Sequence, residues 1–156
     1  MKLCLSISAL VFVLDQISKL AIVSWLDLKT LGRIEVWPPY LNLHMAWNRG
    51  VNFGLFANDT DIMRWVLTAI AVLVSLWLLN WSRRMTHWTG PVFAGLVIGG
   101  ALGNAVDRVV YGAVADFLNM SCCGLNNPYA FNIADIAIFL GAFGLVLFSN
   151  KLDKNG

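Results

Sequence analysis

The chain has 156 residues, of which 58% are hydrophobic and 13% charged, and its mean hydropathy is +0.68. Soluble domains carry roughly 25% charged residues, so this sequence has too little polar surface for an ordinary soluble globule or a disordered chain. The net charge of +2 is too small to predict a nucleic-acid partner. The composition therefore predicts a single integral membrane domain over residues 1–156, whose few acidic residues are almost all Asp.

Four apolar stretches are long enough to cross a bilayer, because a spanning helix needs about 20 mostly apolar residues. They occupy residues 3–26, 65–81, 91–110 and 130–148. The first stretch is interpreted as a retained helix rather than a cleavable signal peptide, since charged residues interrupt it and no clear cleavage site follows. The predicted fold is a mainly α membrane protein built as a four-transmembrane-helix bundle.

The distribution of basic residues predicts the orientation, because Lys and Arg are enriched in cytoplasmic loops. Arg83 and Arg84 lie between the second and third stretches, on the same side as Lys2, and the loop 111–129 has neither Lys nor Arg. We therefore expect both termini in the cytoplasm, with residues 27–64 and 111–129 outside.

The outer segment between the first two stretches has a strand pattern. Leu41, Leu43, Met45 and Trp47 alternate with other residues at a period of two, and the tripeptide that begins at Asn48 predicts a turn. We expect a small extracytoplasmic β-sheet over about residues 34–56, lying between the first and second helices.

Two groups of polar residues fall inside the predicted spans, where a charged side chain costs about 2.5–3.5 kcal/mol on insertion scales. Asp15 and Lys19 are four residues apart, so they can pair on one helix face. Asn104, Asp107 and Arg108 have the same helical spacing at the far end of the third span. Each group is a functional candidate, and each is also compatible with a structural network that fixes the bundle.

Three glycines precede the second group at four-residue intervals, namely Gly95, Gly99 and Gly103. Such a stripe of small residues lets another helix backbone approach closely. The third span is therefore predicted to be tightly packed.

A third group joins two elements. Asp116 lies just past the third span, and Asp135 lies near the start of the fourth, one helical turn after Asn132. If the intervening loop folds back, the two carboxylates meet at the outer membrane boundary. Two such carboxylates in a low-dielectric site cannot both ionise, so the pair is suited either to aspartic-protease chemistry or to a proton or ion relay in a transporter. No CxxC pair or metal-ligand spacing occurs, so neither a metal nor a cofactor is expected.

Five segments of the sequence resemble, in the same order, the signature blocks of the bacterial lipoprotein signal peptidase (signal peptidase II) family. They are residues 15–19, 48–54, 99–108, 112–117 and 131–135, which read DQISK, NRGVNFG, GGALGNAVDR, GAVADF and FNIAD. Asn52 departs from the family pattern, in which a small residue is more usual. The segments extend over nearly the whole chain, so together they are highly specific.

The resemblance implies an enzyme that removes the signal peptide of diacylglyceryl-modified prolipoproteins just before the lipidated cysteine. Asp116 and Asp135 match the family's two catalytic aspartates. Eight further positions in these blocks are candidate substrate-binding or supporting residues: Asp15, Lys19, Asn48, Gly50, Asn104, Asp107, Arg108 and Asn132.

The same resemblance implies a bacterial cytoplasmic (inner) membrane location, a sheet that cradles the substrate, an active site near the outer face and inhibition by globomycin. We expect membrane lipid as a partner, no nucleic acid, and a monomer. Two other classes of protein are weighed against a peptidase. One is a small proton or ion transporter that uses the carboxylates as a relay, and the other is a non-catalytic assembly factor that depends on the glycine stripe.

Overall fold

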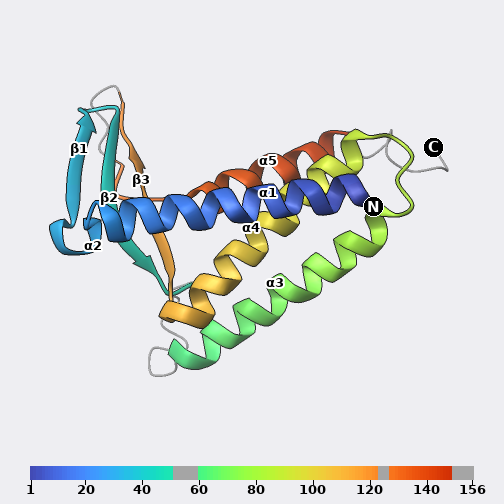
Figure 1. Ribbon diagram of the computed structural model, residues 1–156, viewed down its shortest axis with the longest axis horizontal. Helices are drawn as coiled ribbons and strands as arrows, with labels where there is room; N and C mark the ends of the chain where they lie inside the picture. Colours follow the sequence, from blue (N-terminus) through green and yellow to red (C-terminus); the bar gives the residue numbers. More distant parts are fainter. Residues whose placement is uncertain (51–59, 123–126, 149–156) are drawn as a thin grey trace.

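The computed structural model describes residues 1–50, 60–122 and 127–148. The long helices run along the molecule, and a small sheet lies across one end of them (Figure 1). The helices are α1 (Lys2–Lys19), which continues into the π-helix η1 (Leu20–Trp25), then α3 (Thr60–Ser82), α4 (Thr89–Tyr111) and α5 (Ile133–Leu147). A single-turn helix, α2 (Leu28–Leu31), leads into the sheet.

Among the described residues, three helical segments are long and apolar enough to cross a membrane, namely Lys2–Trp25, Asp61–Ser82 and Thr89–Tyr111. They confirm long apolar helices at the first three predicted spans, although α3 begins five residues before the predicted start at residue 65. The helix α5 is apolar but has 15 residues, which gives roughly 22 Å at 1.5 Å per residue. A typical hydrocarbon core is about 30 Å thick, so the fourth span stays a prediction.

The central helix is α4, which packs against α1, α3 and α5. Its glycines make two of these contacts possible, since a Cβ on Gly99 would lie 2.5 Å from the carbonyl oxygen of Ser8 in α1. On the neighbouring face, a Cβ on Gly100 would lie 2.8 Å from Cγ1 of Ile138 in α5. The predicted glycine stripe is therefore a surface of close backbone approach.

The sheet has three antiparallel strands in the order β1 (Arg33–Trp37), β2 (Leu41–Asn48) and β3 (Val114–Met120). The first two strands confirm the predicted strand segment as far as residue 48, and residues 51–56 of that prediction lie outside the described residues. The prediction was wrong in treating 111–129 as a loop, because β3 comes from it and pairs with β2. This strand is buried on both faces from Val114 to Phe117, so its sequence lacks the alternation that reveals a half-buried strand.

An apolar cluster holds the sheet against the end of the first helix. Phe117 of β3 is fully buried with Leu28 of α2, Val23 of η1 and Leu43 of β2. The π-helix η1 and the short helix α2 therefore pack against one face of β3. Asp116 directly precedes Phe117. The packing of Phe117 therefore fixes the position of the Asp116 backbone relative to the helices.

Candidate active site

The two predicted catalytic carboxylates come from different elements that the chain brings together. Asp116 is the third residue of β3 and is buried, whereas Asp135 lies in the first turn of α5 and is half-buried. The backbones of Leu118 and Phe131 exchange two hydrogen bonds, with N···O distances of 2.8 and 3.0 Å. This bridge places the start of α5 beside β3, as the predicted fold-back of the loop requires.

Asn132 connects the two carboxylates directly. Its Nδ2 donates to Oδ1 of Asp116 at 2.7 Å, and its backbone N–H donates to Oδ2 of Asp135 at 3.2 Å. Its Oδ1 in turn accepts from the backbone N–H of Asp135 at 2.9 Å. The last two bonds form a capping box that begins α5, so the same residue starts the helix and positions both acids.

Two further amide side chains complete the hydrogen bonding of the pair. Nδ2 of Asn48, at the end of β2, donates to the other oxygen of Asp116 at 3.1 Å. Nδ2 of Asn104 in α4 donates to Oδ1 of Asp135 at 2.9 Å. Each carboxyl group therefore receives hydrogen bonds on both of its oxygens.

The turn after β2 orients the amide of Asn48. The backbone N–H of Gly50 donates to Oδ1 of Asn48 at 3.0 Å, which leaves Nδ2 directed at Asp116. Gly50 has φ +104°, a backbone conformation that residues with a side chain rarely adopt, so this turn favours glycine. Gly50 thus supports the site through Asn48.

Asp116 differs from an ordinary carboxyl group in its affinity for a proton. Burial away from water, reinforced by the negative charge of Asp135, raises the pKa of Asp116 to about 7. The hydrogen bonds from Asn48 and Asn132 oppose this shift without cancelling it. Near neutral pH, therefore, a substantial share of the molecules carry a proton on Asp116.

A buried lysine lies beneath the pair, between α1 and α4. Nζ of Lys19 is 2.7 Å from Oδ2 of Asp15 and 2.7 Å from Oδ2 of Asp107, and all three side chains are almost fully buried. The predicted pair of Asp15 and Lys19 is thus part of a three-residue group. Lys19 also donates to Oδ1 of Asn104 at 3.3 Å, which connects the group to Asp135.

The two acids that flank Lys19 each hold the backbone next to one of the paired carboxylates. Oδ1 of Asp15 accepts from the N–H of Ala134 at 3.0 Å, and Oδ2 of Asp107 accepts from the N–H of Ala115 at 3.2 Å. Ala134 directly precedes Asp135, and Ala115 directly precedes Asp116. The group around Lys19 therefore fixes the spacing of α5 and β3, from which the two carboxylates project.

Two other residues lie at the edge of this network. Arg108 donates from Nη1 to the carbonyl oxygen of Asn104 at 3.3 Å, and its buried Nε finds no acceptor among the described residues. Gln16 donates to both Asp15 and Asp107, at 3.1 and 3.3 Å. Gln16 is not among the site residues predicted from the sequence, although a polar amide beside Asp15 inside an apolar span was a usable signal.

All ten residues selected from the sequence thus lie in one region, where the sheet meets α4 and α5. Within the described residues, no group of three or more His, Cys, Asp and Glu side chains is placed to hold a metal ion. The chemistry that the site offers is that of two adjacent carboxyl groups, held by amide donors and backed by one buried cation.

Fold and site together define a membrane protein with a pair of carboxyl groups at the sheet end of its helices. Residues 7–151 match the family model described as signal peptidase (SPase) II. The chain therefore belongs to the signal peptidase II family.

Similar proteins agree with this assignment. The lipoprotein signal peptidase of Methylobacterium sp. (strain 4-46) is 41% identical over 143 residues, which cover 92% of this chain and 86% of that protein. The lipoprotein signal peptidase of Aeromonas hydrophila is 39% identical over 151 residues, covering 95% and 88%. A solved structure described as a bacterial membrane enzyme has a TM-score of 0.76 at 25% identity and covers 97% of this chain and 89% of its own. A membrane location follows from the family and from the three apolar helices.

Proposed function

We propose that this chain is a membrane-embedded aspartic endopeptidase that removes the signal peptide from diacylglyceryl-modified prolipoproteins, cleaving just before the lipidated cysteine. The observation that carries the proposal is the connection of Asp116 and Asp135 through Asn132 at the sheet end of the bundle. The family and the names of its members support the substrate class.

In the proposed mechanism, Asp116 carries the proton and Asp135 is the ionised base. The raised pKa of Asp116 supports the first assignment, and the position of Asp135 in the first turn of α5 supports the second, because a helix N-terminus favours negative charge. Asp135 takes a proton from water as the water oxygen attacks the scissile carbonyl carbon, and Asp116 protonates the carbonyl oxygen. As the tetrahedral intermediate collapses, Asp135 gives its proton to the leaving amine and Asp116 regains its own.

The remaining candidate residues act through this pair. Asn48, Asn104 and Asn132 hold the two carboxyl groups in place. Asp15, Lys19 and Asp107 position the elements that carry them, so we assign these three as positioning residues. Arg108, whose Nε has no acceptor among the described residues, is proposed to orient the substrate.

The placement in the membrane follows from the proposed substrate. A lipid-anchored substrate arrives through the bilayer with its scissile bond near the outer interface, so we place the sheet and the paired carboxylates at the outer face of a bacterial inner membrane and both termini in the cytoplasm. The helix α5 is proposed as the fourth span, with flanking residues completing its length. The chain then forms one peptidase domain over residues 1–156, active as a monomer and sensitive to globomycin.

Conversion of a lipidated proprotein by purified enzyme tests the proposal. Asp116→Asn and Asp135→Asn preserve the size of each side chain and remove its acid–base chemistry, so each should abolish cleavage. Glu35→Gln is the matched control, because Glu35 is an exposed acid on β1 whose only ion pair among the described residues is with exposed Arg33. Cleavage retained by either Asp variant would contradict the assignment.

A proton transporter is the second candidate. It is favoured by one observation, the continuous polar chain from Asp15 through Lys19 and Asn104 to Asp135. It predicts proton flux in proteoliposomes without a lipoprotein substrate, and no effect of globomycin. The same purified protein assayed for cleavage and for flux distinguishes the two.

A further inference from the structure

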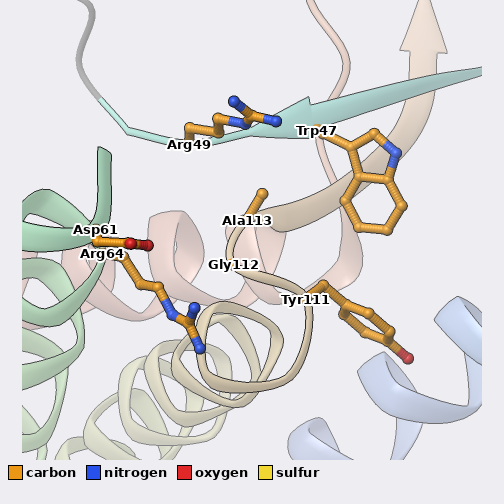
Figure 2. A pocket seen from close by; sticks show the side chains of 7 residues that line it. All are labelled: Trp47, Arg49, Asp61, Arg64, Tyr111, Gly112 and Ala113. Carbon is orange, nitrogen blue, oxygen red and sulfur yellow. The ribbon is translucent and has the colours of Figure 1, made fainter. Parts of the chain in front are cut away.

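A second site lies close to the paired carboxylates without belonging to them. It is a pocket of about 490 Å³ between the end of β2, the start of α3 and the turn from α4 to β3. Figure 2 shows Arg49 on one side of the opening, Asp61 and Arg64 on another, and the rings of Trp47 and Tyr111 on a third. We call it the arginine pocket.

The proposed cleavage reaction does not use the arginine pocket. Successive side chains of a strand point to opposite faces, and Asn48 directs its amide at Asp116, so Trp47, which precedes it in β2, faces the other way. Arg49 follows the end of β2 and lines the pocket together with Trp47. The diacylglyceryl anchor of the proposed substrate is also uncharged. The two guanidinium groups that line this pocket are therefore available to a different ligand.

The charged side chains that line the pocket have few partners in the described part of the chain. Among the described residues, Arg49, Asp61 and Arg64 form no ion pair with any side chain, and Arg49 has no hydrogen-bond partner. Arg64 uses Nη2 to bind the carbonyl oxygen of Val109 at 2.7 Å, which caps the end of α4, while its buried Nε has no acceptor in the part of the chain that is described. The guanidinium of Arg64 also lies over the ring of Trp65, 4.9 Å from its centre. Among the described residues, the pocket thus presents two cations and one anion to a ligand.

The position of the pocket indicates where its ligand comes from. It lies where α3 begins and α4 ends, and these are two of the three helices that can span the membrane. Trp and Tyr favour this boundary between hydrocarbon and water, where Trp47 and Tyr111 lie 5.7 Å apart between ring centres. Lipid phosphate groups lie at the same depth, and guanidinium groups bind phosphate strongly.

We propose that the arginine pocket binds the headgroup of a zwitterionic phospholipid that carries a primary ammonium group. The phosphate lies between Arg49 and Arg64, and the positive partial charge at the start of α3 adds to their attraction. The ammonium lies at Asp61, and the glycerol backbone rests on Trp47 and Tyr111. A bound lipid would brace β2, α3 and α4 against one another beside the active site.

Lipid binding to the delipidated full chain in detergent tests this proposal, measured by native mass spectrometry during titration. The probes are phosphatidylethanolamine, phosphatidylglycerol and diacylglycerol with the same short acyl chains, and inorganic phosphate. We expect phosphatidylethanolamine to bind best. Arg49→Gln should weaken its binding about tenfold, and Asp61→Asn should remove the preference over phosphatidylglycerol.

Arg33→Gln is the matched control, because Arg33 is an exposed arginine at the same end of the molecule, on β1 rather than at the pocket. It should bind phosphatidylethanolamine as the wild type does. Arg49 is preferred to Arg64 as the test position, since replacing Arg64 also removes the cap of α4. The proposal would be overturned if diacylglycerol or inorganic phosphate bound as tightly as phosphatidylethanolamine. It would also be overturned if Arg33→Gln weakened the binding of phosphatidylethanolamine as much as Arg49→Gln does. Because the readout is binding, its failure is separate from any failure of the peptidase assignment.

Discussion

Protonation of a single carboxyl group should make both activity and stability depend on pH. Because the pKa of Asp116 is raised from 3.8 to about 7, the folded chain keeps a proton there that the unfolded chain releases. This stabilisation is complete below pH 3.8 and is lost as the pH rises through about 7. We therefore expect kcat/KM to fall above a pH of about 7, and the free energy of unfolding to decrease as the pH rises towards that value.

Cleavage rates and thermal unfolding measured across this pH range check both expectations. Asp116→Asn is the control for stability, since its amide cannot ionise and the unfolding curve should lose the part of its pH dependence that Asp116 contributes. A wild-type activity profile that stays level to a pH of about 9 would contradict a protonated Asp116 in the mechanism.

Individual residues also show which side-chain contacts could be predicted from the sequence and which could not. Helical spacing predicted that Asp15 and Lys19 pair, because residues four apart share a face, and the structure confirms it. The equally short contact from Lys19 to Asp107 joins two different helices, and no local pattern encodes it. Spacing likewise could not bring Asp116 to Asn132, since that contact depends on a strand pairing that forms only in the folded chain.

At the scale of secondary-structure elements, the group around Lys19 fixes β3 and α5 relative to α1. Lys19→Met would leave Asp15 and Asp107 buried without their cation, which costs about 3–5 kcal/mol for a broken buried pair. We expect a large fall in thermal stability and loss of cleavage. Asp15→Asn is the milder partner variant, because its amide oxygen can still accept from Ala134 while Lys19 keeps Asp107. Equal stability of wild type and Lys19→Met would show that the group does not brace these elements.

The contact between α1 and α4 gives a second prediction at this scale. Ala normally stabilises a helix by about 1 kcal/mol relative to Gly, but in Gly99→Ala the new methyl group would lie 2.5 Å from the carbonyl oxygen of Ser8. The helices must separate, so we expect a lower melting temperature. Val109→Ile adds one carbon on an exposed face of α4 and should leave it unchanged. A Gly99→Ala protein as stable as this control would refute the close approach.

At the scale of the whole molecule, the sequence predicted the helices better than the sheet. Long apolar runs identify helices without knowledge of their neighbours, so the helices at the first three predicted spans could be predicted. The third strand was missed because residues 114–117 are buried on both faces, so they lack the alternation of apolar and polar residues that marks a half-buried strand, and the segment was taken for a loop. The candidate residues nevertheless lie together in the structure, and they could be selected because polar side chains next to apolar spans are conspicuous in a chain with so few charges. Their roles stay predictions.

The orientation of the whole molecule decides where the proposed chemistry takes place. The N-terminus and the connection from α3 to α4 lie at the end opposite the sheet (Figure 1), and that connection carries Arg83 and Arg84. Because such basic loops stay in the cytoplasm, the sheet and the paired carboxylates should face outwards. Exposed Lys29 lies in α2 at the sheet end, and exposed His87 lies in the connection from α3 to α4 at the opposite end. Lys29→Cys and His87→Cys, each made in a chain whose native cysteines are replaced, therefore report on the two sides of the membrane.

A membrane-impermeant maleimide should label Lys29→Cys in intact spheroplasts and His87→Cys only after lysis. Parallel cleavage assays on both variants show that the labelled protein is folded. The reverse labelling pattern would place Asp116 and Asp135 in the cytoplasm. There they could not reach the junction before a lipidated cysteine at the outer face, so the same result would also remove the basis of the proposed peptidase function.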